Sequence, residues 1–350
     1  MQMTPGPTAV PPRVRERMSE PMPNPDVEQS FFELYDDVCG KLQRVYGTDD
    51  DVVVMGGEGI LGLEAAIAST VGPGDEVLCV SNGLYGDGFA DFVESYGGEP
   101  TVVGAEYTEP LDVGGVEAEL ERGDYELATM VHCETPTGTL NDIEPVLELL
   151  DDYGVLTIVD AVSSLGGTPV PDEYIDINLG ASQKAFSSPP GLTTAAVSDR
   201  AWEVATERDP DSLYTNLLPW RDTAERFPYT HLAANVAALD ESLSLLLEEG
   251  LESVYERHER AATHCRERGA ELGLELYPPA ERSAPTVTAF HLPGRAEAAQ
   301  GELASEHDVV LSTGLGELAG DILRVGHMGY NAEVEKVDRV LDALATVLTA

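Results

Sequence analysis

Positive charge is scarce in this sequence. Lysine and arginine together number 20 against 64 aspartates and glutamates, which gives a formal net charge of −44 over 350 residues. So negative a field disfavours binding to nucleic acid or to an anionic membrane. The acids are dispersed through amphipathic segments instead of forming one tail. This dispersion predicts a folded surface adapted to high salt, where screening weakens the repulsion between carboxylates.

Lysine is the rarest of the charged residues. There are three, Lys41, Lys184 and Lys336, and the other 17 basic residues are arginines. A lysine in such a chain needs a specific reason to be there. Each of the three is therefore a candidate for a chemical role that arginine cannot fill.

Cysteines and long apolar runs are also few. The four cysteines lie far apart with no C-x-x-C spacing, which suits neither a disulfide framework nor a metal site. No apolar run approaches the roughly 20 residues that cross a membrane. The segment 1–20 is rich in proline and arginine and has no signal-peptide core. We expect a cytoplasmic protein with no metal and no membrane partner.

The length predicts more than one domain. We expect an extended, proline-rich N-terminal arm over 1–20, a large domain over 21–240 and a small C-terminal domain over 241–350. Between 51 and 160, short apolar runs alternate with amphipathic segments, which predicts an α/β fold with a largely parallel sheet. From 233 onward, long helical stretches and a few strand-like runs predict a smaller α+β domain.

A glycine-rich motif follows the first expected strand. Gly57-Glu58-Gly59-Ile60-Leu61-Gly62 fits G-x-G-x-x-G, so a NAD-dependent oxidoreductase is one candidate. A dinucleotide site also needs an acid at the end of the second strand, which here ends Val80-Ser81-Asn82. That absence disfavours a dinucleotide. The motif can still be a helix N terminus that holds a phosphate, or a tight turn with no ligand.

Two further residues suggest chemistry when they are taken together. Asp160 ends the apolar run 155–159, and Lys184 follows in a loop of small residues that would partly bury its amine. Alone, Asp160 is equally well a helix N-cap. A solvated surface role for Lys184 is the less favoured alternative, because lysine is so rare in this chain. Together they supply a carboxylate for a pyridinium nitrogen and an amine for an aldehyde, the two groups that pyridoxal phosphate requires.

These motifs resemble the class V aminotransferases of fold type I, nearest the alanine–glyoxylate and serine–pyruvate group. The similarity runs from Met3-Thr-Pro-Gly-Pro-Thr8 to Leu323-Arg-Val-Gly-His-Met-Gly-Tyr-Asn331. Its most specific parts are Val159-Asp-Ala-Val-Ser-Ser-Leu-Gly-Gly167 and Ala181-Ser-Gln-Lys-Ala185. The resemblance implies pyridoxal 5′-phosphate as cofactor and transfer of an amino group from alanine or serine to glyoxylate or pyruvate. It also implies a homodimer with shared active sites.

The resemblance also implies a role for each site residue. Lys184 would form the Schiff base with the cofactor, and Asp160 would pair with the ring nitrogen. Tyr85 would stack on the ring, and the Thr135 hydroxyl would lie near its phenolic oxygen. The remaining implied roles are phosphate binding by Gly57, Glu58, Gly59, Gln183 and the neighbouring subunit's copy of Thr230, and substrate binding by Arg324 and Gly6.

The sequence departs from the family at the phosphate. Glu58 stands where relatives have a small hydroxyl residue, so its side chain must point away or meet a cation. Phe227 stands where a tyrosine hydroxyl often serves the phosphate, and the His-Arg pair that many relatives carry near 22–25 is missing.

A lyase on the same fold and a regulatory protein without activity are both less favoured by the sequence. A class V lyase of the cysteine desulfurase type needs a cysteine on a small-domain loop, and the candidate loop at 312–316 has none. A non-catalytic regulatory protein is disfavoured because Lys184, Asp160 and Arg324 are all present.

Overall fold

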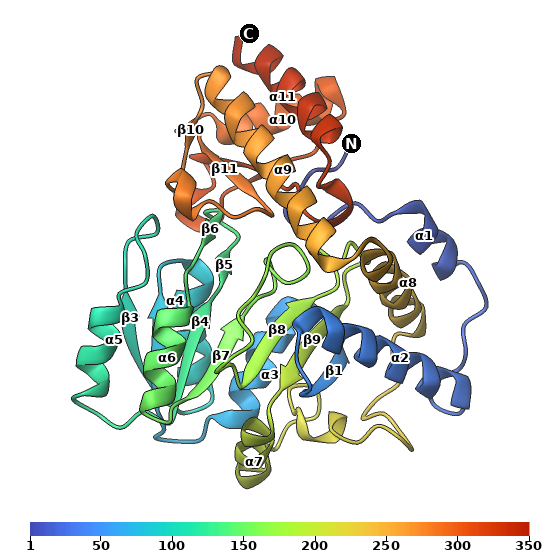
Figure 1. The fold of residues 1–350 in the computed structure, drawn as a ribbon, viewed down its shortest axis with the longest axis vertical. Helices are drawn as coiled ribbons and strands as arrows, with labels where there is room; N and C mark the ends of the chain where they lie inside the picture. Colours follow the sequence, from blue (N-terminus) through green and yellow to red (C-terminus); the bar gives the residue numbers. More distant parts are fainter. Residues whose placement is uncertain (350) are drawn as a thin grey trace.

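A seven-stranded sheet forms the centre of the larger domain in the computed structural model, which describes residues 1–349 (Figure 1). Its strands are β1 (Asp51–Gly56), β2 (Glu76–Ser81), β3 (Glu99–Gly104), β4 (Leu127–Val131), β7 (Leu156–Asp160), β8 (Ile177–Ala181) and β9 (Leu192–Val197). The order across the sheet is β1-β9-β8-β7-β4-β2-β3. Only the two pairs that involve β9 are antiparallel. The predicted α/β fold with a mostly parallel sheet is confirmed.

Helices cover both faces of this sheet, which is why its strands are apolar on both sides. The helices of the larger domain are α2 (Gln29–Tyr46), α3 (Gly59–Thr70), α4 (Leu84–Ser95), α5 (Val113–Leu120), α6 (Glu144–Asp152), α7 (Asp199–Arg208) and α8 (Ala233–Glu249). In Figure 1, α5 and α6 lie in front of the sheet and α3 and α4 behind it. Strand β2 serves both layers: Leu78 packs in the cluster with α5 and α6, and Val77 in the cluster with α3 and α4.

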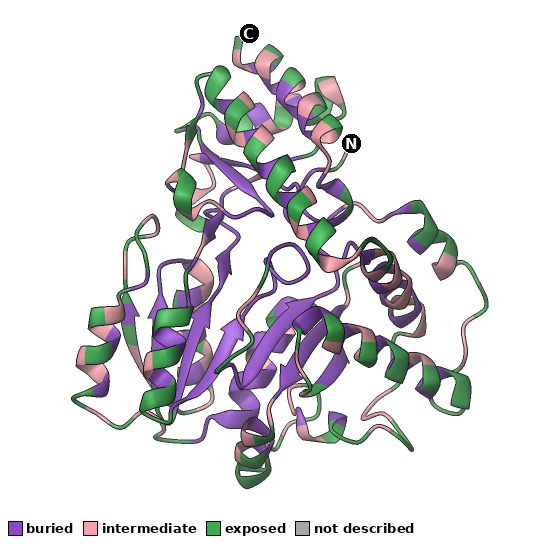
Figure 2. Cartoon of the chain, viewed as in Figure 1, coloured by how far each residue is buried: buried purple, intermediate pink, exposed green. Residues whose placement is uncertain are grey.

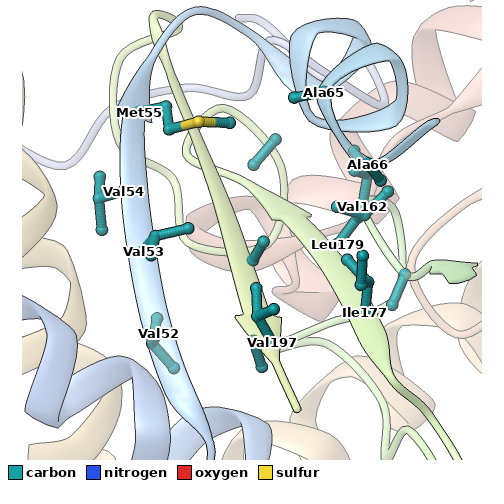
Figure 3. Close-up of a cluster of buried hydrophobic side chains, with 14 of the residues drawn as sticks. Val52, Val53, Val54, Met55, Ala65, Ala66, Val162, Ile177, Leu179 and Val197 are labelled. Carbon is teal, nitrogen blue, oxygen red and sulfur yellow. The ribbon is translucent and has the colours of Figure 1, made fainter. Parts of the chain in front are cut away.

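The core beside β1 and β9 shows the alternation of a buried strand. Val53 and Met55 project from β1 to the side opposite Val54 (Figure 3). All three side chains are buried, and small residues of α3, Ala65 and Ala66, let that helix pack closely. The central strands are buried along their length, whereas outer helices such as α5 and α6 are buried on one side only (Figure 2).

The smaller domain is built on an antiparallel sheet of order β10-β11-β13-β12. Its strands are β10 (Glu275–Leu276), β11 (Thr288–His291), β12 (Ser312–Thr313) and β13 (Ile322–Val325), and its helices are α9 (Leu251–Glu271), α10 (Ala296–His307) and α11 (Val334–Thr349). The predicted boundary at 240 stays a prediction. Leu243 and Leu246, beyond it on α8, pack in the core of the larger domain.

The N-terminal arm differs from the extended segment that we expected. Residues 12–18 form helix α1 (Pro12–Met18), in which proline occupies the first turn, where it costs no hydrogen bond. Val14 is buried, and Arg13 pairs with Glu241 and Glu248 of α8. Packing on α8 therefore overrides the extended tendency of the proline-rich sequence.

Before α1 the chain crosses from one domain to the other. The Met3 amide donates to the Val310 carbonyl at 2.9 Å, and the Gly326 amide donates to the Met3 carbonyl at 2.7 Å. Five residues later, the Thr8 amide donates to the Gln183 carbonyl at 3.0 Å. Residues 3–8, which we name the N-terminal strap, thus connect the small-domain sheet to the loop that carries Lys184. Within residues 1–349 no helix is long and apolar enough to cross a membrane.

Candidate active site

A cavity of about 250 Å³ lies at the carboxyl ends of β7 and β8. Ligands of open α/β sheets bind at this edge, where the ends of parallel strands meet. Eight of the eleven site residues predicted from the sequence line the cavity: Gly6, Glu58, Gly59, Tyr85, Thr135, Asp160, Gln183 and Lys184. The other three, Gly57, Thr230 and Arg324, are not part of its lining.

Lys184 lies in the short connection from β8 to β9. Its Nζ donates to the Pro5 carbonyl of the N-terminal strap at 2.9 Å. Burial and the positive charge of Arg324 together lower the pKa of Lys184 to about 8, against the opposing effect of Asp160. An appreciable fraction of this amine is therefore neutral near pH 7, and the neutral form is the one that attacks a carbonyl carbon.

Asp160 is the last residue of β7, beside the strand that leads to Lys184. Its side chain accepts the Val162 amide at 2.8 Å. Burial raises its pKa to about 6, because the effect of burial outweighs the opposing effects of the Val162 hydrogen bond and the charge of Lys184. The group is thus mostly a carboxylate at neutral pH, as a partner for a protonated ring nitrogen must be.

Tyr85 begins α4, and a carboxylate that we did not predict holds this turn in place. Glu134 is 0% exposed and accepts the amides of Tyr85 at 3.2 Å and Gly86 at 2.7 Å. Burial raises the pKa of Glu134 to about 7, against the two backbone hydrogen bonds. The only sequence signal for this residue was its place directly before Thr135, in a motif that we read for its hydroxyl.

Thr135 and Arg324 connect the cavity to the smaller domain. The Thr135 hydroxyl is hydrogen-bonded to Ser163, another residue of the lining. Arg324 on β13 is 6% exposed and donates from Nε to Thr313 O at 2.7 Å and from Nη1 to Thr135 O at 3.0 Å. Its Nη2 has no hydrogen-bond partner within residues 1–349, so it is available to a substrate carboxylate.

The turn expected to hold a phosphate is arranged differently from the prediction. The Gly57 amide already donates to the Gly191 carbonyl at 2.9 Å. Glu58 does not point away from the cavity and does not meet a cation. Its carboxylate accepts the Ile60 amide of α3 at 3.3 Å and the Gln183 side-chain amide at 3.3 Å.

Thr230 lies outside the cavity of its own chain. Its hydroxyl donates to Asp26 at 3.0 Å on the exposed surface. The preceding residue, Tyr229, accepts the Gly56 amide on its hydroxyl at 3.1 Å, so this segment lies next to the phosphate turn. A role for Thr230 in the site of a neighbouring subunit stays a prediction.

The lining therefore fits one end of pyridoxal phosphate better than the other. Lys184, Asp160, Tyr85 and Thr135 supply the amine, carboxylate, aromatic face and hydroxyl that the ring requires. At the other end the helix N terminus, which suits an anion, already carries the carboxylate of Glu58. Among the described residues no arginine or histidine lines the cavity to neutralise a second anion.

Comparison with known proteins gives a consistent result. Residues 5–340 match the family described as aminotransferase class-V. An uncharacterized aminotransferase of Methanocaldococcus jannaschii is 36% identical over 99% of this chain and 91% of its own length. A pyridoxamine–pyruvate transaminase of Mesorhizobium japonicum is 34% identical over 93% of this chain and 86% of its own length. The crystal structure of an alanine–glyoxylate aminotransferase from Nostoc sp. has a TM-score of 0.95 and 30% identity, covering 99% of this chain and 94% of that one.

Proposed function

Because the chain belongs to the class V aminotransferases, a family that depends on pyridoxal phosphate, we propose that it moves an amino group from alanine or serine to glyoxylate or pyruvate. The observation that carries the proposal is that Lys184 and Asp160 line one cavity, with Arg324 one hydrogen bond behind it. Relatives named for alanine and glyoxylate support small substrates.

Each residue has a task that follows from its surroundings. A bound pyridoxal group supplies an electron sink that stabilises negative charge on the substrate Cα. Asp160, a buried carboxylate in the cavity lining, would hold a proton on the ring nitrogen of the bound group. The Lys184 amine, with a pKa of about 8, is basic enough to take the Cα proton and is still partly neutral near pH 7.

Arg324 orients the substrate through its carboxylate. The carbonyls of Thr313 and Thr135 accept hydrogen bonds from Nε and Nη1 of the guanidinium and so fix its plane, and the remaining Nη2 is left for the substrate. A planar fork held in this way binds a carboxylate in one orientation, whereas a lysine is a mobile point charge. Arg324→Lys should therefore raise the Michaelis constant for α-carboxylate substrates about tenfold or more and leave binding of the pyridoxal group intact. An unchanged constant would assign the carboxylate to another residue.

The attachment to Lys184 can be tested directly. Borohydride reduction of the protein with a bound pyridoxal group should leave a stable mass label on the peptide that contains Lys184. Lys41 pairs with Asp240, and Lys336 donates to Tyr330 and lies over its ring, so neither should carry the label. Lys184→Ala should abolish both the label and transamination. A label on Lys41 or Lys336 would contradict the proposed mechanism.

We also infer that the protein is a homodimer whose sites are shared. Thr230 lies on the surface directly after Tyr229, and the ring of the exposed Tyr214 packs on Tyr229 with centroids 4.8 Å apart; Leu213, before Tyr214, is exposed as well. Apolar groups exposed in this way are typical of an interface. If Thr230 acts in the partner's site, mixed dimers of Lys184→Ala and Thr230→Ala chains contain one site with both defects and one intact site. Mixing the two inactive variants should then restore activity. If Thr230 acts in the site of its own chain, every site of a mixed dimer has one defect and mixing restores nothing.

A second candidate function has pyridoxamine itself as amino donor and pyruvate as acceptor, the pair named for the Mesorhizobium relative. The observation that favours it is the carboxylate of Glu58 at the N terminus of α3. Alanine formed from pyridoxamine and pyruvate without added pyridoxal phosphate would support this function. A strict requirement for added pyridoxal phosphate would exclude it.

A further inference from the structure

We propose that Glu58 and Gln183 make the cavity selective for the pyridoxal ring without a phosphate, by binding the 5′-hydroxyl group of the free vitamer. Pyridoxamine and pyridoxal would then enter and leave as substrate and product. The inference rests on the second candidate function and assigns its specificity to two residues.

The place of a phosphate is already taken by a negative charge. Glu58 is the N-cap of α3, a helix of twelve residues, and its carboxylate accepts the Ile60 amide. A carboxylate at a helix N terminus is stabilised by the helix dipole, as a phosphate would be. Two anions on one helix end repel each other, and among the described residues Lys184 is the one basic residue in the lining, with no arginine or histidine beside it to offset the repulsion.

Three of the donors around this turn are engaged within the protein. The Gly57 amide is bound to Gly191, the Ile60 amide to Glu58, and Nε2 of Gln183 to Glu58. A phosphate near neutral pH offers mainly acceptor oxygens, so it would have to displace a bond to use any of these three donors. Such a displacement leaves buried groups of the protein unpaired.

Gln183 provides an independent observation that points to a ligand with a donor. The residue is 5% exposed and lines the cavity, and its Oε1 is buried without a hydrogen-bond partner. The hydrogen bond to Glu58 fixes this orientation, because a flipped amide would place oxygen against carboxylate oxygen. A buried acceptor without a partner is costly, and a hydroxyl group that donates to it removes that cost. The 5′-hydroxyl of pyridoxal or pyridoxamine is such a donor.

The net reaction balances without another reactant. The amino nitrogen leaves C4′ of pyridoxamine and bonds to C2 of the 2-oxo acid. Two electrons and a proton leave C4′, and C2 gains two electrons and a proton, with Lys184 as the proton carrier. C4′ becomes the aldehyde carbon with oxygen from water, and the 2-oxo oxygen leaves as water. The products are pyridoxal and the 2-amino acid.

Competition between vitamers tests the inference. Purified protein in molar KCl is titrated separately with pyridoxal and with pyridoxal phosphate, followed by visible absorbance, borohydride reduction and peptide mass analysis. We expect a dissociation constant about tenfold or more lower for pyridoxal, and a label on Lys184 without the mass of a phosphate.

Variants separate charge from size at the same position. Glu58→Gln removes the charge at similar volume, and Glu58→Ser also opens the space; both should shift the preference toward pyridoxal phosphate, the serine variant more. Glu64 on the same helix accepts a hydrogen bond from the Tyr96 hydroxyl and does not line the cavity. Glu64→Gln should therefore leave the ratio of the two dissociation constants unchanged.

Each outcome has a distinct meaning. Wild-type preference for pyridoxal phosphate, or an unchanged ratio in both Glu58 variants, would overturn the inference and leave the aminotransferase function standing. A protein in which neither vitamer labels Lys184 would overturn the proposed function together with the inference.

Discussion

Burial and neighbouring charges hold the ionisable groups of the cavity close to neutral pH. Burial moves the pKa of Lys184 down to about 8 and the pKa values of Asp160 and Glu134 up to about 6 and 7. Groups poised in this range exchange protons at the pH at which an enzyme works. The charge of Asp160 acts on both Lys184 and Glu134, so a substitution of Asp160 changes the titration of the other two groups.

Glu134→Gln tests the least expected of these groups. The folded protein raises the pKa of Glu134 from its ordinary 4.5 to about 7. The protonated side chain therefore contributes fully to the free energy of unfolding below about pH 4.5, and this contribution is lost as pH rises to about 7. The glutamine variant lacks this loss. Between pH 5 and pH 8 the difference in unfolding free energy should therefore move in favour of the variant, by up to about 3 kcal/mol at roughly 1.4 kcal/mol per pKa unit.

Denaturant unfolding at several pH values and constant molar KCl measures this difference. Glu317→Gln, at an exposed position, controls for the loss of one negative charge. A difference between wild type and Glu134→Gln that does not change with pH would contradict the shifted titration.

At this scale the sequence predicted residues with a chemical signature and missed those defined by position. Lys184 stood out because lysine is rare, and Asp160 because it ends a buried strand. The carbonyl of Pro5 and the unpaired oxygen of Gln183 gain their meaning only when the chain folds back on itself. Side-chain direction decides the role of Glu58, and residue type alone left that direction open.

Among the elements, strong periodicity was predictable and short or weakly patterned segments were not. The alternation predicted between 51 and 160 is present as strands β1, β2, β3, β4 and β7 with helices between them. We did not predict β8 and β9, because Asn178 and Gly180 interrupt the apolar run of β8 and the flanking loop hides the pattern. Helix α10 was also missed, since its alanines and glutamates give little contrast between faces.

The N-terminal strap lines the cavity and contacts Lys184. Gly6 has a φ of +109°, and a Cβ there would lie 2.6 Å from Cδ of Lys184. Gly6→Ala therefore combines backbone strain with a steric conflict, at about 1–3 kcal/mol for the strain alone. We expect pyridoxal binding to weaken about tenfold or more, measured by absorbance titration.

The matched control is Gly40→Ala, in helix α2, where an added Cβ meets nothing within 4 Å. It should bind normally and be slightly more stable, since alanine favours a helix. Normal binding by Gly6→Ala would mean that the strap does not position Lys184.

For the whole molecule the dominant property is its negative charge. Sixty-four acids share 20 basic partners, so most carboxylates on the surface repel one another. The screening length falls from about 10 Å at 0.1 M salt to about 3 Å at 1 M. We predict that the melting temperature rises by on the order of 10 °C between 0.1 and 3 M KCl, and that activity rises with it.

A thermal scan over a KCl series gives the measurement, and sucrose at matched water activity separates screening from solute exclusion. Equal melting temperatures in dilute buffer and molar KCl would contradict salt adaptation.

The N-terminal strap also has a consequence for biosynthesis. Met3 is bonded to Val310 and Gly326, which leave the ribosome more than 300 residues later. The large-domain sheet is complete once β9 has emerged, so most of the cavity wall can fold during translation. The N-terminal strap can take its place beside Lys184 only after β13 has been synthesised. The amine is therefore held in its final position only when synthesis of the chain is nearly finished, and a nascent chain that stalls before β13 carries an unassembled site.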